Sequence, residues 1–222
     1  MKIFNFLKNL FYDYVYLRHS ISSIIRRASL NAKVFDVGCG LGSLKKIRNL
    51  RKDIVLFGCD ILEFSYSDHH YADVYYSFSP NKFSEELSSI PEKFDLVISN
   101  HNLEHVFNRL VYLQNLSNIC DKGGMLYLAF PSEFSLDFPS GLDGSLNYFD
   151  DITHISPPPD FSLISNFLND NGFKIIYSNK RERPILHRFY GFLITKFSMP
   201  KKVSYALWAY WGFEAKIIAI KI

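Results

Sequence analysis

Three glycines at alternate positions follow a short apolar run that contains a single acid. Residues 34–44 read Val-Phe-Asp-Val-Gly-Cys-Gly-Leu-Gly-Ser-Leu, so Asp36 precedes Gly38, Gly40 and Gly42. Glycine accepts positive φ values and lets the backbone approach a ligand without a Cβ clash. A glycine turn between a strand and a helix is typical of nucleotide-cofactor sites. The segment therefore predicts a cofactor-binding turn.

The spacing of the glycines separates the classes of cofactor. A dinucleotide turn needs Gly-x-Gly-x-x-Gly/Ala, which leaves room for a pyrophosphate. That pattern, begun at Gly38, places Ser43 where the third glycine belongs. The carboxylate of Asp36 disfavours a pyrophosphate and suits a cationic group such as an ammonium or a sulfonium. The segment resembles motif I of the class I S-adenosylmethionine-dependent methyltransferases, Asp-x-Gly-x-Gly-x-Gly, and matches it in full.

The rest of the chain alternates between predicted strands and helices, which favours a parallel sheet. The predicted strands are 33–37, 55–59, 71–74, 94–98, 125–130, 173–178 and 214–222, and the predicted helices are 43–51, 82–89, 103–119 and 161–171. This order resembles the methyltransferase fold. The resemblance implies one α/β domain over residues 1–222, with a seven-stranded, mostly parallel Rossmann-like sheet, helices on both faces and an antiparallel last strand.

The resemblance also implies that S-adenosylmethionine is the cofactor, and it assigns contacts on the first two strands. Asp36 would contact the ammonium group in the methionine part of S-adenosylmethionine, directly or through water. Gly38, Cys39 and Gly40 would carry the backbone beneath the cofactor. Asp60 ends the second predicted strand and would accept hydrogen bonds from both ribose hydroxyls, while Ile61 would pack on the adenine.

The next two strands carry further implied contacts. Asp73 is expected to end the third strand, where the family often has an acid that accepts from the adenine amino group. The backbone N–H of Val74 would then meet a ring nitrogen. An ordinary turn aspartate is an equal alternative for Asp73. Asn100 leaves the fourth strand at the methionine part of the cofactor.

Two segments offer acid–base groups. Leu-Glu-His-Val at 103–106 resembles the start of the family's helix after strand four, so His105 would line the pocket or act in catalysis, unless it is structural. Asp151-Ile-Thr-His154 resembles the loop after strand five of many small-molecule and sugar methyltransferases. His154 would deprotonate a hydroxyl, since imidazole titrates near neutrality, and Asp151 would orient it. A loop Asp–His pair that caps the next helix is an equal alternative.

We predict no metal site. Asp68-His69-His70 lacks partners at ligand spacing and is assigned to the surface. The cysteines, Cys39, Cys59 and Cys120, are far apart and form no Cys-x-x-Cys pair, which argues against a structural zinc and fits a reducing cytoplasm. No apolar run is long enough for a transmembrane helix, and the N-terminus shows no signal-peptide cleavage site. We therefore expect a cytoplasmic protein.

The net charge of +3 hides two basic, aromatic flanks, residues 1–33 and 180–202. Such flanks suit an anionic substrate, a membrane surface or nucleic acid, or they simply surround apolar helices that pack on the core. The fourth predicted strand ends in Ser-Asn-His-Asn, and the Asn-Pro-Pro-Tyr motif of nucleic-acid amino methylation is absent. A nucleic-acid partner is therefore disfavoured, and peripheral membrane contact stays open.

These observations predict an S-adenosylmethionine-dependent methyltransferase that methylates an oxygen of a small or glycosyl metabolite. An N-terminal helical segment (1–30) would precede the sheet. A long loop (131–160) and an aromatic, basic insert (180–212) would build the acceptor pocket. The alternatives are a quinone or lipid methyltransferase at a membrane surface and a non-catalytic module that binds S-adenosylmethionine. The sequence indicates no oligomeric state.

Overall fold

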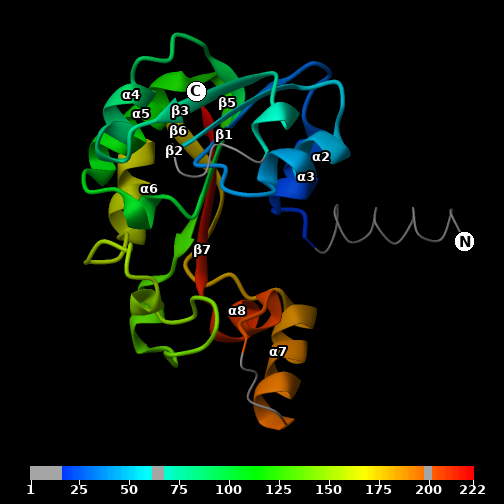
Figure 1. The fold of residues 1–222 in the computed structure, drawn as a ribbon, viewed down its shortest axis with the longest axis vertical. Helices are drawn as coiled ribbons and strands as arrows, with labels where there is room; N and C mark the ends of the chain where they lie inside the picture. The colour runs from blue at the N-terminus through cyan, green and yellow to red at the C-terminus, as the bar shows by residue number, and fades with distance from the viewer. Residues whose placement is uncertain (1–16, 62–67, 198–201) are drawn as a thin grey trace, which may run out of the picture. The chain divides into compact units, whose positions relative to one another are not determined.

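The computed structural model describes residues 17–61, 68–197 and 202–222 (Figure 1). Its seven strands form one sheet in the order β3-β2-β1-β4-β5-β7-β6, mostly parallel with antiparallel last strands. The strands are β1 Lys33–Val37, β2 Val55–Ile61, β3 Val74–Phe78, β4 Phe94–Asn100, β5 Cys120–Pro131, β6 Phe173–Asn179 and β7 Glu214–Lys221. The predicted fold class is confirmed.

Seven α-helices occur in the described part of the chain. They are α2 Ile21–Arg27, α3 Ser43–Leu50, α4 Phe83–Leu87, α5 Arg109–Ile119, α6 Phe161–Asp170, α7 Ile185–Phe197 and α8 Tyr205–Trp211. Of the predicted N-terminal helix, residues 1–16 lie outside the described residues, and α2 occupies half of the remainder. None of the described helices combines the length and the apolar character that a membrane crossing requires.

The chain divides into two compact units. The first comprises the described residues of Met1–Ser99, Leu113–Tyr127 and Ile220–Ile222, and the second comprises Asn100–Tyr112 and Leu128–Ala219. The glycine turn belongs to the first unit. His105, Asp151 and His154 belong to the second.

In the first unit, the register of the parallel strands determines which residues lie beside one another across the sheet. Asp36 of β1 pairs with Gly58 of β2, and Phe57 of β2 pairs with Val74 of β3. Phe35 and Phe57 pack against Phe94, with ring centroids 4.7 and 4.9 Å from it. Figure 1 shows α2 and α3 on one side of these strands and α4 on the other.

A glycine lets α3 lie close to the sheet. A Cβ built on Gly58 would come within 2.8 Å of Leu44 Cδ2, and Leu44 is a fully buried residue of α3. Since α3 begins at Ser43, directly after the glycine turn, this packing also sets the exit of the turn. The position of the turn therefore depends both on its local sequence and on the packing of α3 against the sheet.

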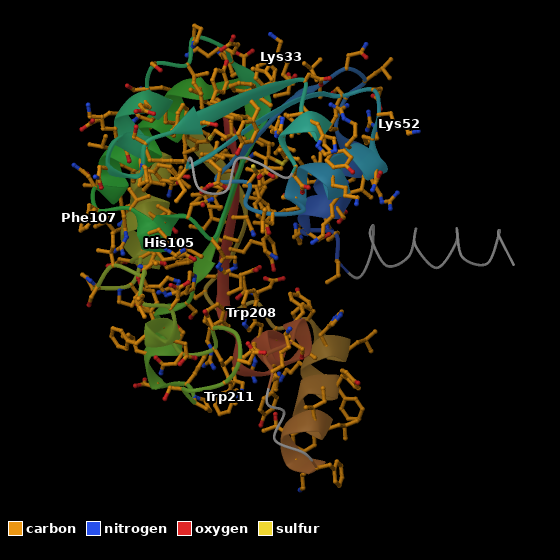
Figure 2. All side chains as sticks on the ribbon, viewed as in Figure 1. Lys33, Lys52, His105, Phe107, Trp208 and Trp211 are labelled. Carbon is orange, nitrogen blue, oxygen red and sulfur yellow. The ribbon has the colours of Figure 1, made fainter. Side chains whose placement is uncertain are left out.

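The long loop after β5 is an ordered part of the second unit. It contains two short 3-10 helices, Glu133–Asp137 and Tyr148–Asp150. Phe138 and Leu146 of the loop form a buried cluster with Phe213, and Trp208 and Trp211 of α8 pack against it (Figure 2). The indole N–H of Trp208 also donates to the carbonyl of Ser145 at 2.8 Å.

Several element boundaries differ from the sequence prediction, among them those of β3 and α5. The third strand begins at Val74 rather than Tyr71, because residues 69–71 form a 3-10 turn. The predicted helix 103–119 is interrupted. Leu103–His105 form a 3-10 turn, and α5 starts at Arg109. The Arg109 guanidinium satisfies the carbonyl of Leu103 at 2.8 Å, which replaces a helical hydrogen bond at that position.

Candidate active site

The glycine turn adopts a backbone that favours glycine at every second position. Gly38, Gly40 and Gly42 have φ values of 65°, 54° and 87°. The N–H of Cys39 donates to the carbonyl of Cys59 at 3.0 Å, which ties the turn to the end of β2. A Cβ built on Gly40 would meet no heavy atom of the described chain within 4 Å. As far as the described residues show, the turn therefore borders open space, as a cradle for a ligand must.

Two buried carboxylates meet this turn. Asp36 is 2% exposed and accepts a hydrogen bond from the Ser43 hydroxyl at 2.6 Å. Asp60 is 8% exposed and accepts from the backbone N–H groups of Gly40 and Ile61. The ends of β1 and β2, the turn and the start of α3 are thus joined by hydrogen bonds to two acids.

The electrostatics of this pair favour a cation. Burial raises the pKa of Asp36 to about 7, the hydrogen bond from Ser43 opposes this rise, and the nearby charge of Asp60 adds to it. A positive group beside the two acids would stabilise their ionised forms. A cationic ligand would therefore suit the open side of the turn.

A third acid at the turn was not foreseen. Asp68 accepts a hydrogen bond from the N–H of Gly42, although the sequence assigned Asp68-His69-His70 to the surface as a group. His69 and His70 are indeed exposed. No short-range pattern identifies Asp68, because its partner lies 26 positions earlier in the chain.

The role expected for Asp73 and Val74 is wrong. Asp73 precedes β3 instead of ending it, and its carboxylate accepts from Arg48 and from the N–H of Leu56, both at 2.7 Å. Since Val74 pairs with Phe57, Asp73 is level with Leu56 and lies roughly 13 Å from the level of Asp60 along the strands. It is a structural turn aspartate at the opposite edge of the sheet from the glycine turn.

The end of β4 leads into a buried charged cluster that the sequence did not reveal. Asn100 is half-buried at the last position of β4. His101 follows with a φ of 59°, and its ring lies between Glu104 Oε1 at 3.0 Å and Glu214 Oε2 at 3.4 Å. Although burial opposes protonation, these two carboxylates raise the pKa of His101 to about 10. Trp208 covers the ring.

His105 and His154, which the sequence analysis named separately, contact one another in the second unit. Their ring centroids lie 4.9 Å apart, and Figure 2 places His105 on the segment after β4. The Nδ1 atom of His154 lies 2.6 Å from the carbonyl of Tyr148. A carbonyl only accepts, so Nδ1 carries the proton and Nε2 offers a lone pair.

Asp151 contacts His154 on the side opposite to the one expected of an orienting acid. Its Oδ2 lies 3.8 Å from Nε2 of His154, whereas the Tyr148 carbonyl holds Nδ1. Asp151 also accepts from the N–H and the hydroxyl of Thr153. Partial burial opposes ionisation of Asp151, but these two hydrogen bonds hold its pKa below the usual value. Asp151 therefore presents a negative charge beside Nε2.

A family model described as a methyltransferase domain matches residues 9–178, which is more than half of the sequence. The chain belongs to the class I S-adenosylmethionine-dependent methyltransferase superfamily. The match includes the glycine turn, Asp60 and the His105–His154 pair of this methyltransferase. No curated protein matches the sequence.

Solved structures share the fold of this methyltransferase at low sequence identity. A chain of the complex between the Haloferax volcanii Trm112 methyltransferase activator and a methyltransferase is 14% identical, with a TM-score of 0.63 over 98% of this chain and 92% of that chain. An Archaeoglobus fulgidus S-adenosylmethionine-dependent methyltransferase is 19% identical, with a TM-score of 0.56 over 96% and 99%. An O-methyltransferase from neocarzinostatin biosynthesis, solved with S-adenosylmethionine and a naphthoic acid, is 11% identical, with a TM-score of 0.56 over 95% and 57%.

The buried state of Asp36 predicts a pH dependence of stability. Its folded-state pKa of about 7 lies well above the ordinary value of an aspartate, 3.8, so the folded protein binds more protons between these values. The contribution of Asp36 to the free energy of unfolding is therefore complete below about pH 4 and is lost as the pH rises through about 7. Urea unfolding between pH 4 and 8 should show a decline that Asp36→Asn reduces. The exposed Asp170→Asn control should keep the wild-type slope, and an unchanged slope in Asp36→Asn would contradict the assignment.

Proposed function

We propose that this methyltransferase transfers the methyl group of S-adenosylmethionine to an oxygen atom of a small or glycosyl metabolite. The observation that carries the oxygen acceptor is the lone pair on His154 Nε2, fixed there by the hydrogen bond from Nδ1–H to the Tyr148 carbonyl. A hydroxyl is a weak nucleophile until it loses its proton, so a positioned base favours this class of acceptor.

The cofactor would be held by residues that the resemblance named and that the geometry supports. These are Asp36, Gly38, Cys39, Gly40, Asp60 and Ile61, which all belong to the first unit. S-adenosylmethionine, when bound, supplies a methyl group on an electrophilic sulfonium. The open space beyond Gly40 and the negative pair of Asp36 and Asp60 fit a cationic molecule that approaches the backbone closely.

The second unit would provide the acid–base chemistry. Nε2 of His154 accepts the proton of the acceptor hydroxyl, while the Tyr148 carbonyl keeps the ring oriented through Nδ1–H. The imidazolium that forms is stabilised by the Asp151 carboxylate, whose Oδ2 lies 3.8 Å from Nε2. The chain's other contribution is alignment of the acceptor, which makes the reaction effectively unimolecular.

Cofactor binding tests the glycine turn. Calorimetry should show binding of S-adenosylmethionine and no binding of NAD. Gly40→Ala should weaken the former at least about tenfold, because the new methyl group occupies the open space and strains a left-handed backbone.

Gly123→Ala is the matched control for backbone strain, since Gly123 also has a positive φ and no heavy atom of the described chain near its Cβ position. It should bind S-adenosylmethionine like the wild type. If Gly40→Ala and Gly123→Ala bind S-adenosylmethionine with equal affinity, the glycine turn is not part of the cofactor site.

Turnover tests the histidine. Once an acceptor is found, His154→Ala should lower the rate of methyl transfer by about one hundred to ten thousandfold, with little change in cofactor affinity. His70→Ala, which removes an exposed histidine of the first unit, should leave both unchanged. Full turnover in His154→Ala would exclude a histidine base. Cofactor binding without turnover on any hydroxyl acceptor would favour the non-catalytic module.

One observation favours a second candidate, a lipid or quinone acceptor at a membrane surface. Helix α7 leaves several large apolar side chains exposed: Ile185, Leu186, Phe189, Tyr190, Phe192 and Phe197. Gly191, on the buried side of α7, lies against α8, where a Cβ would come within 2.1 Å of the Ala206 carbonyl oxygen. Arg188 and Lys196 are exposed on the same helix. An amphipathic, basic helix of this kind suits an anionic membrane interface.

Vesicle co-sedimentation tests this surface. The protein should pellet with vesicles that contain anionic lipid, and Phe189→Asp should lower the bound fraction by roughly tenfold because a charge replaces buried apolar area. Phe107→Asp is the matched control, since Phe107 is 92% exposed and lies outside α7 (Figure 2). Absence of wild-type binding would rule out the lipid acceptor, and equal losses in the two variants would show that α7 is not the contact.

A further inference from the structure

The second unit brings together three side chains of the types that hold metal ions. Glu104, His105 and His154 each offer one ligand atom, and these atoms lie within 4.8 Å of one another. Two imidazoles and one carboxylate form a donor set that suits divalent transition metals and leaves coordination positions open. The sequence predicted no metal site, because His154 lies 50 positions from Glu104 and no local spacing links them.

Both histidines have the tautomer that a metal ligand requires. His154 Nδ1 donates to the Tyr148 carbonyl at 2.6 Å. Thr153 Oγ1 lies 2.9 Å from His105 Nδ1 and donates its single proton to Asp151 at 2.6 Å, so it accepts from His105 Nδ1–H. Each ring therefore keeps a lone pair on Nε2. Metal-bound histidines are typically oriented by such a hydrogen bond from the second ring nitrogen.

The carboxylate has an unsatisfied oxygen. Glu104 is 1% exposed, and its Oε1 lies 3.0 Å from His101 Nδ1. Its Oε2 is buried and has no hydrogen-bond partner among the described residues. A buried carboxylate oxygen without a partner is costly, and a cation would satisfy it. This orphaned atom is independent of the histidine tautomers and also points to a ligand.

We propose that Glu104, His105 and His154 bind a divalent transition-metal cation. The positions left open on the cation would take water or oxygen atoms of the acceptor, which favours an acceptor with two neighbouring oxygens. The catalytic consequence, although not cation binding itself, rests on the proposed function. A hydroxyl on the cation would become more acidic and would release its proton to solvent water. His154 would act as the base only in protein without the cation, because its Nε2 is a ligand when the cation is bound.

Binding of Co²⁺ to protein stripped with a chelator tests the proposal, because Co²⁺ bound by histidine has a visible absorption spectrum. We expect one equivalent to bind, with displacement by Zn²⁺. Glu104→Gln, which is nearly isosteric, and His105→Ala, which removes a partly exposed side chain, should each weaken binding at least about tenfold. Circular dichroism verifies that each variant is folded.

The control is the double variant His69→Ala/His70→Ala, which removes an exposed histidine pair of the first unit. It should keep wild-type Co²⁺ affinity. The proposal is overturned if wild-type protein binds no Co²⁺, if His105→Ala binds it normally, or if binding is lost in the His69→Ala/His70→Ala control. Calorimetry with S-adenosylmethionine separates the two proposals. If the protein binds the cofactor but not Co²⁺, the metal site is contradicted and the proposed function is not. If it binds Co²⁺ but not the cofactor, the proposed function is contradicted and the metal site is not.

Discussion

The contact between the glycine turn and the carboxylates of Asp36 and Asp60 constrains the whole first unit. The N–H of Gly40 donates to Asp60, and the Ser43 hydroxyl donates to Asp36, so β2, the turn and α3 are fixed together. This arrangement buries two acids side by side, and the pKa of Asp36 rises accordingly. Two buried carboxylates beside one another lower the stability of the folded protein unless a positive charge compensates them. The positively charged cofactor proposed above would offset the cost of burying this pair.

The second unit uses backbone and hydroxyl groups to fix the proton positions of its histidines. The Tyr148 carbonyl and the Thr153 hydroxyl hold the Nδ1 protons, which leaves Nε2 of both His154 and His105 free to bind. The loop that carries Tyr148 and Thr153 is itself ordered by packing on α8. Order in a long loop, which costs conformational entropy, is therefore linked to the chemistry of the site. If the Nε2 atoms bind a cation, the two histidines form a metal centre. If Nε2 of His154 binds a proton instead, His154 is a base.

Local patterns predicted the glycine turn and most of the strands, because these depend on neighbouring residues. The alternation of strands and helices predicted a parallel sheet, and the resemblance to the methyltransferase family supplied the antiparallel last strand. Asp73 was misplaced because the segment Tyr-Ala-Asp-Val could stand at the start or at the end of a strand. Only the pairing of Val74 with Phe57 shows that it stands at the start. His101 and Glu104 were missed for another reason. Their charged partner Glu214 lies 113 positions from His101, so tertiary contacts alone create the cluster.

The most direct test of the account is the proton released when S-adenosylmethionine binds. Calorimetry at pH 7 in two buffers of different ionisation enthalpy counts these protons. If the cation settles beside Asp36, it lowers a pKa of about 7, and close to half a proton should be released. Asp36→Asn should release none from this group. Binding that releases no proton in the wild type, or the same number in the variant, would contradict the claim that the buried acids form the cofactor site.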